Sequence, residues 1–202
     1  MTPQSHQIRT LTEVEFQKEA EPRLREVFVN DDPYDQPFSP GVQTRKILYE
    51  FWYELEPPLL EAIVRVASEQ GDKGFYVSIL DRPDIKAQNR PYHWYVPFSR
   101  IKAYRSLVGP LQNVIYSQNG RWGIMASDEH HALLEGSSAF VETIQKFIPE
   151  LEHQVYEFLD AWRYNQANYG SKLNWLPGLL RHVYGQETAE RLLRETDLAS
   201  LL

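Results

Sequence analysis

The stretch of sequence that decides the fold is residues 112–148, QNVIYSQNGRWGIMASDEHHALLEGSSAFVETIQKFI. Two short runs of strand-forming composition, Asn113–Ser117 and residues 121–126, flank the dipeptide Asn119-Gly120. This dipeptide favours a type I′ turn, in which both central residues have positive φ, so it predicts a tight two-residue antiparallel hairpin. A second turn at Asp128-Glu129 leads into a third predicted strand over residues 131–135. The region therefore predicts a meander of three antiparallel strands.

Helical patterns and further strands precede the meander. Thr10 or Thr12 can cap a first helix, which Pro22 should break or restart. Apolar residues at helical spacing predict a helix over residues 42–55, and the two prolines that follow start another helix, which ends at Gly71. Strands are predicted over residues 74–80 and 92–98.

Only helices are expected after the meander. Apolar residues recur at helical spacing from Phe140 to Ile148, so one face of that helix can pack on the sheet. Pro149 then starts another helix that reaches about Tyr164, and residues 165–171 are polar and predict a loop. Two short helices are predicted over residues 173–184 and 188–201.

Together these elements predict an α+β protein. It would contain one sheet of about five mostly antiparallel strands, because the connections are too short for parallel crossovers, with helices before and after it. A chain of 202 residues is long enough to bury a sizeable core. We expect residues 1–170 to form the α+β domain and residues 171–202 to form a C-terminal helical appendage packed on it.

The composition excludes several classes of site. The chain has no cysteine, so it cannot form a disulfide, a thiolate metal site or a cysteine nucleophile. The N-terminus lacks the pattern of a signal peptide, and no apolar run approaches the ~20 residues of a membrane span. The usual phosphate-loop, dinucleotide, serine-hydrolase and zinc-protease motifs are also missing. These features predict a soluble cytoplasmic protein that does not enter a membrane.

Negative charge is concentrated near the N-terminus. Residues 10–35 contain eight acidic and three basic residues, which accounts for −5 of the net charge of −7. Asp31, Asp32 and Asp35 lie in a proline-rich predicted loop, where they can steer a basic protein partner or simply keep the surface soluble. Trp122 would be a second contact residue if it were exposed, although a strand tryptophan beside a glycine is more often buried.

The run Asp128-Glu129-His130-His131 is the candidate catalytic site if the protein is an enzyme. Carboxylates beside imidazoles can act as general acid and base, and Asp128 and His130 could bind a metal with a distant third ligand. The alternative is a polar turn followed by one inward and one outward histidine. Adjacent strand residues point to opposite faces, so His130 and His131 are not expected to share one metal ion.

A basic segment lies between Arg90 and Arg105 and contains no acidic residue. Aromatic residues alternate with its bases, which is the composition that binds single-stranded nucleic acid or another anionic ligand. The net negative charge of the chain opposes binding to a phosphate backbone, and alternate aromatics in a strand usually pack a core.

The sequence therefore favours a non-enzymatic protein that binds another macromolecule, as an inhibitor, an immunity-type protein or an assembly factor. The expected partner is a protein, and a basic one if the acidic loop forms the contact. No cofactor and no metal are expected. A small hydrolase or transferase using Asp128, Glu129 and His130 or His131 is the alternative, and anion or nucleic-acid binding between Arg90 and Arg105 is the third hypothesis. The sequence leaves the oligomeric state open.

Overall fold

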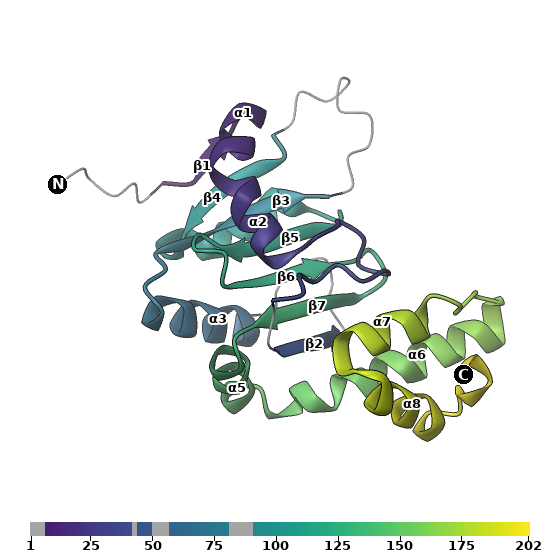
Figure 1. The fold of residues 1–202 in the computed structure, drawn as a ribbon. Helices are drawn as coiled ribbons and strands as arrows, with labels where there is room; N and C mark the ends of the chain where they lie inside the picture. Colours follow the sequence, from purple (N-terminus) through teal and green to yellow (C-terminus); the bar gives the residue numbers. More distant parts are fainter. Residues whose placement is uncertain (1–6, 42–43, 50–56, 81–90) are drawn as a thin grey trace.

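The computed structural model of the chain describes residues 7–41, 44–49, 57–80 and 91–202. Its centre is one antiparallel sheet with helices on both faces, so the predicted α+β class is confirmed (Figure 1). The sheet has seven strands rather than about five, in the order β1-β4-β3-β5-β6-β7-β2. The strands are β1 (Arg9–Leu11), β2 (Thr44–Tyr49), β3 (Gly74–Ile79), β4 (His93–Pro97), β5 (Asn113–Ser117), β6 (Trp122–Ala126) and β7 (His131–Gly136).

The predicted meander is confirmed as β5, β6 and β7, but the first turn is not of the predicted type. The N–H of Gly120 donates to the carbonyl of Ser117 at 3.1 Å, and Gly120 has the predicted positive φ of 65°. Asn119 does not have positive φ, so this is not a type I′ turn. The reason is that the amide side chain of Asn119 donates to Asp72 at 2.6 Å and its backbone N–H donates to Ser117 Oγ at 3.0 Å. The loop is also longer than two residues, because β5 ends at Ser117 and β6 begins at Trp122.

The predicted helix over residues 42–55 is wrong where the structure describes it. Thr44–Tyr49 is the edge strand β2, which pairs with β7, and the rest of that prediction lies outside the described residues. Ile47 and Leu48 are both buried, on opposite faces of the sheet. A strand that is buried on both faces lacks the alternation of apolar and polar residues that marks a half-exposed strand, and its apolar run therefore resembles part of a helix.

Each face of the sheet carries a separate hydrophobic core. The first core lies beneath α3 (Pro57–Glu69), α4 (Tyr104–Val108) and α5 (Ser138–Phe147). The second lies beneath α2 (Glu21–Val27) on one side and α6 (Gln154–Tyr169), α7 (Leu176–Tyr184) and α8 (Gln186–Glu195) on the other. Figure 1 shows α2 crossing the middle of the sheet and the C-terminal helices gathered at the β2 edge. Because α2 and the C-terminal helices share the second core, the loop that follows α2 lies beside those helices.

The helix ends follow the local sequence. Thr12 and Glu15 form a reciprocal capping box at the start of α1 (Glu13–Glu15), which agrees with one of the two predicted caps. A π-helical turn, Phe16–Ala20, follows, and α2 restarts with Pro22 in its first turn, as predicted. Helix α6 runs on to Tyr169, through most of the predicted loop, and ends at Gly170, which is in the left-handed conformation. The short 3-10 segments are Phe98–Ala103, Pro149–Glu152 and Ala199–Leu201.

None of the helices in the described ranges is both long and apolar enough to cross a bilayer.

Candidate functional site

The three aspartates predicted as a contact surface lie on the loop between α2 and β2, and all three are exposed. The base of this loop is closed by a β-bridge between Phe28 and Phe38, with a hydrogen bond of 2.7 Å from the Val29 N–H to the Pro37 carbonyl. Phe28 and Phe38 are buried and their rings pack 5.6 Å apart. The loop is therefore anchored in the second core at both ends.

Neutral donors hold two of the aspartates, Asp32 and Asp35, in place within the loop. The Asn30 side chain donates to Asp35 at 3.2 Å and accepts from the Asp32 N–H at 3.0 Å. The Asp32 carboxylate accepts from the Tyr34 N–H at 2.8 Å, which is an Asx turn. These bonds order the two carboxylates without neutralising their charge.

Tyr34 joins this loop to the turn between β6 and β7. Its hydroxyl donates to Asp128 at 2.9 Å, and the Gln112 amide donates to the same carboxylate oxygen at 2.8 Å. Two acidic segments that are 94 residues apart in the chain therefore meet at one place. Below them the Tyr34 ring packs edge-on against His131 and Trp175, each with ring centroids 5.1 Å apart. The side chains that join the two segments thus rest on a packed aromatic base.

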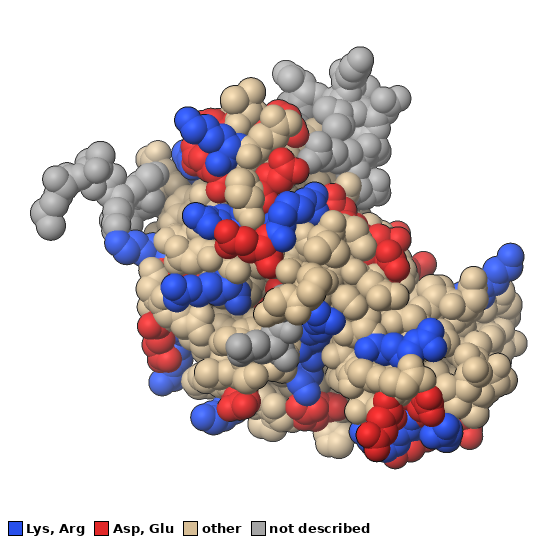
Figure 2. Space-filling model, in the orientation of Figure 1, with Lys and Arg blue, Asp and Glu red and all other residues tan. Residues whose placement is uncertain are grey.

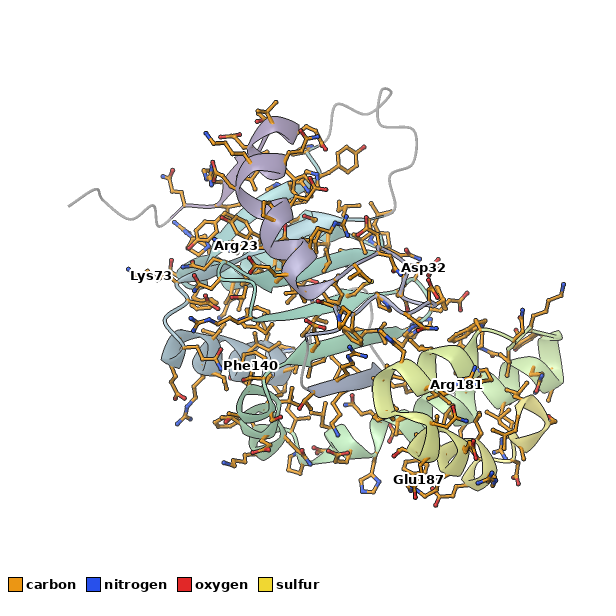
Figure 3. All side chains as sticks on the ribbon, in the orientation of Figure 1. Arg23, Asp32, Lys73, Phe140, Arg181 and Glu187 are labelled. Atoms are coloured by element: carbon orange, nitrogen blue, oxygen red, sulfur yellow. The ribbon has the colours of Figure 1, made fainter. Side chains whose placement is uncertain are left out.

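We call Asp31, Asp32, Asp35, Asp128 and Glu129 the acidic surface. Asp31 forms an ion pair with Arg25 at 2.7 Å. The other four carboxylates have no ion pair with any residue that the structure describes. Figure 2 shows acidic side chains gathered where Figure 3 labels Asp32, at the opposite end of the strands from Lys73. The surface therefore carries uncompensated negative charge.

Asp128 stays ionised near neutral pH. Partial burial raises the pKa of its carboxyl, but the hydrogen bonds from Gln112 and Tyr34 outweigh this and leave the pKa below its ordinary value. Burial and the neighbouring Asp128 charge also raise the pKa of Tyr34 well above its ordinary value, so its hydroxyl keeps the proton that it donates. The bond between Tyr34 and Asp128 is therefore a charge-assisted hydrogen bond.

The residues of the catalytic alternative form a compact hairpin turn. Ser127 Oγ accepts from the N–H groups of Glu129 and His131, at 3.1 and 3.3 Å, and His130 adopts a positive φ of 60°. His131 is fully buried, and burial lowers its pKa to about 4, so it is neutral at physiological pH. One of its ring nitrogens contacts Ser127 Oγ at 2.9 Å, and the other lies 3.4 Å from the Pro33 carbonyl. The structure thus gives His131 a place in the aromatic base rather than on an open surface.

No cluster of three or more histidine, aspartate or glutamate side chains in the described part of the chain could hold a metal ion.

A serine, a histidine and a glutamate come together on the second-core face of the sheet. Ser78 Oγ lies 2.9 Å from one ring nitrogen of His93, whose other ring nitrogen lies 3.5 Å from Glu13. Ser78 is 1% exposed and also contacts the Tyr116 hydroxyl, and Phe16 stacks on the imidazole at 3.6 Å. These contacts satisfy buried polar groups of the second core.

Trp122 lies in the first core, where it is fully buried and stacks on Phe140 with ring centroids 5.6 Å apart. Its indole N–H donates to the Asp72 carboxylate at 2.9 Å. The neighbouring Gly123 has no room for a side chain, because Val27 and Phe28 pack against its backbone. Trp122 is therefore not available as a surface contact.

The basic segment is split between the core and the surface. Tyr92, Trp94 and Tyr104 are buried, so they cannot stack on a nucleic-acid base, and Arg90 lies outside the described residues. Lys102 and Arg105 are exposed. They border a groove of about 510 Å³ that is lined by Pro57, Leu60, Glu61, Val64, Arg65, Ile101, Lys102 and Arg105.

Sequence reasoning missed Arg45 and Glu135, which face each other across β2 and β7. Glu135 is 1% exposed, and burial raises its pKa to about 9. A signal was present in the sequence. Residues two positions apart in a strand lie on the same face of the sheet. Glu135 follows Leu133 by two positions, so the sequence already indicated that its side chain points toward the same core as that of Leu133.

Comparisons with models of protein families, with curated proteins and with solved structures found no match for this chain.

Proposed function

We propose that this protein is a non-enzymatic binding protein, of the inhibitor, immunity or assembly-factor kind, and that its acidic surface receives a basic protein partner. The observation that carries the proposal is the bond from Tyr34 to Asp128, which unites two acidic segments from distant parts of the chain. Neither segment alone would present more than a small number of charges.

The electrostatics support a role in association. Asp32, Asp35, Asp128 and Glu129 lie within one region and are exposed, and the groups that hold the first three are uncharged. Clustered charge of one sign raises the rate at which an oppositely charged partner arrives, by 10-fold or more at low salt. Because Asp31 is already paired with Arg25, it contributes less to this field.

The order of the surface also supports binding. A loop that is already fixed by a β-bridge, an Asx turn and a tyrosine hydrogen bond loses less conformational entropy when a partner docks. Rigid scaffolds that present ordered polar loops are a common architecture for recognition.

The experiment compares partner capture by three immobilised proteins from a lysate of the native cells. They are the wild type, a surface variant that carries Asp32→Asn, Asp35→Asn, Asp128→Asn and Glu129→Gln, and a control variant with four exposed acids replaced elsewhere. The control substitutions are Glu142→Gln, Glu150→Gln, Glu157→Gln and Glu187→Gln. Both variants change the net charge from −7 to −3, so only the position of the charge differs.

We expect a basic protein that the wild type and the control retain equally and that the surface variant loses by about tenfold. Amide side chains keep an acceptor oxygen for the Asx turn and for the Tyr34 hydroxyl, so the melting temperatures of all three proteins should agree closely. Equal retention by all three proteins would contradict the proposal, as would retention that falls equally in both variants.

A further inference from the structure

A groove opens between α3 and the helical segment that follows β4, on the face of the sheet that carries the first core. Its volume is about 510 Å³. One wall is formed by residues of α3, which are Pro57, Leu60, Glu61, Val64 and Arg65, and the other wall by Ile101, Lys102 and Arg105. We call this site the α3 groove. It shares no residue with the acidic surface.

The floor of the α3 groove is aliphatic. Leu60 and Val64 are one turn apart on α3 and therefore lie on the same side of the helix. Leu60 belongs to the first core, whereas Val64 is only partly buried. Ile101 packs against the same core from the opposite wall and is also partly exposed. These side chains give the groove a concave apolar surface, from which an apolar ligand would displace water.

The charged side chains that line the groove are mostly basic. Arg65, Lys102 and Arg105 are exposed, and the only acid among the eight lining residues is Glu61. Arg65 is also paired with Glu69 at 3.6 Å, whereas Lys102 forms no ion pair with any residue in the described ranges. These five residues together carry one net positive charge. The complement of this rim is a head group with one negative charge.

The dimensions favour a small molecule over a segment of a partner protein. A volume of about 510 Å³ lies within the range of roughly 300–1,000 Å³ that is typical of small-molecule sites. A specific protein interface takes about 20–30 residues on each side, and only eight described residues line this groove. None of these eight is aromatic, so a ring would find no stacking partner there, whereas an alkyl chain can lie along the aliphatic floor.

We propose that the α3 groove binds a fatty acid of medium chain length, with its alkyl chain on the aliphatic floor and its carboxylate at Lys102 and Arg105. The chain supplies most of the affinity, since each methylene group that is fully buried tightens binding about fourfold. The basic rim fixes the orientation of the ligand and discriminates against a cation with the same chain. This site is independent of the proposed partner surface, and either can exist without the other.

Probes of matched structure separate the contributions of the chain and the head group. Octanoate, octanol and octyltrimethylammonium share one chain and carry a negative, a neutral and a positive head group, and acetate has the head group without the chain. Each is titrated into the full-length protein at about pH 7, below the concentration at which it forms micelles. Binding is followed by the ¹³C signals of the methyl groups of Leu60, Val64 and Ile101. The methyl groups of Leu192, which is buried in the second core, are the control.

We expect saturable shifts of the three floor residues and no shift of Leu192. Octanoate should bind most tightly, octanol more weakly and octyltrimethylammonium most weakly, because only the first complements the rim. Acetate should not saturate the signals. Hexanoate should bind about four- to tenfold more weakly than octanoate, because its chain buries two fewer methylene groups.

Lys102→Glu reverses one charge at the rim and leaves the floor unchanged. It should weaken octanoate binding about three- to tenfold and tighten octyltrimethylammonium binding by a similar factor. Opposite changes for the two probes cannot arise from a general loss of structure. Lys172→Glu is the control, because Lys172 is exposed, lies outside the groove and changes the net charge by the same amount. Its affinities for both probes should stay within about twofold of those of the wild type.

Shifts that stay linear with octanoate would overturn the proposal. Equal affinities for the three octyl probes would also overturn it, because the basic rim would then play no part, and so would a Lys102→Glu variant that binds both charged probes more weakly. Binding to phosphatidylglycerol vesicles without saturable shifts by octanoate would show that this face meets a lipid surface rather than a single fatty acid, and would likewise contradict the proposal.

Discussion

At the scale of single residues, Glu135 links the stability of the fold to pH. Its pKa is raised by burial to about 9 in the folded protein, whereas a glutamate in an unfolded chain titrates near 4.3. Below the unfolded value both states hold the proton and the full stability is present. As the pH rises from there to about 9, only the unfolded state releases the proton, so stability is lost progressively over this window.

Glu135→Gln should remove this dependence. The free energy of unfolding of the wild type should fall, relative to that of the variant, by about 1 kcal/mol per pH unit between about pH 5 and about pH 8. Urea denaturation of both proteins at these two values measures the difference. Parallel dependences on pH would show that the Glu135 carboxyl is ionised in the folded protein.

At the same scale, Tyr34 supplies a hydroxyl that bridges the two acidic segments. Tyr34→Phe removes its bond to Asp128 but keeps the ring between His131 and Trp175. We expect a loss of about 1 kcal/mol in stability, together with a weaker affinity for the partner although no charge is changed. Tyr164→Phe is the control, since Tyr164 is 58% exposed. Unchanged affinity in Tyr34→Phe would mean that the two segments act separately.

At the scale of elements, the loop between β5 and β6 depends on its glycine. Gly120 has positive φ, and a side chain there would also meet Glu26. Gly120→Val should therefore lower the free energy of unfolding by about 1 kcal/mol or more, because a β-branched residue is strained in that conformation. In Gly178→Ala, by contrast, the new methyl group meets no neighbour and lies in a helix, so its stability should stay equal or rise. A neutral Gly120→Val variant in chemical denaturation would argue against this loop geometry.

The elements differ in how far the sequence alone could predict them. The strands β5, β6 and β7 were recognisable because they are neighbours in the chain and are separated by turn residues. The type of the first turn could not be recognised from the local sequence, because Asn119 is held by Asp72, which comes 47 residues earlier. The edge strand β2 was mistaken for a helix because its partner β7 lies about 90 residues away and because its buried apolar residues, Ile47 and Leu48, lie on opposite faces.

At the scale of the whole molecule, the sheet is covered on both faces, and this explains what the sequence concealed about the candidate sites. Trp122 and three aromatics of the basic segment, Tyr92, Trp94 and Tyr104, are core residues, although their composition resembles that of a contact surface. The acids at Asp31, Asp32 and Asp35 were identified from charge density alone. Their association with Asp128 and Glu129 could not be identified from the sequence, because it depends on how the loop after α2 and the β6–β7 turn pack together. Only the folded chain turns two modest acidic segments into one surface.

The most direct test of the acidic surface is the salt dependence of association. Once the partner is identified, its association and dissociation rate constants are measured with the wild type and with the variant that carries Asp32→Asn, Asp35→Asn, Asp128→Asn and Glu129→Gln. The measurements are made at about 0.1 M and about 1 M salt, where the Debye length falls from about 10 Å to about 3 Å. We expect the association rate constant of the wild type to fall about tenfold or more, and that of the variant to start low and change little. The dissociation rate constants of the two proteins should be similar. Association rate constants that coincide at both salt concentrations would contradict it, and these carboxylates would then serve only to keep the surface soluble.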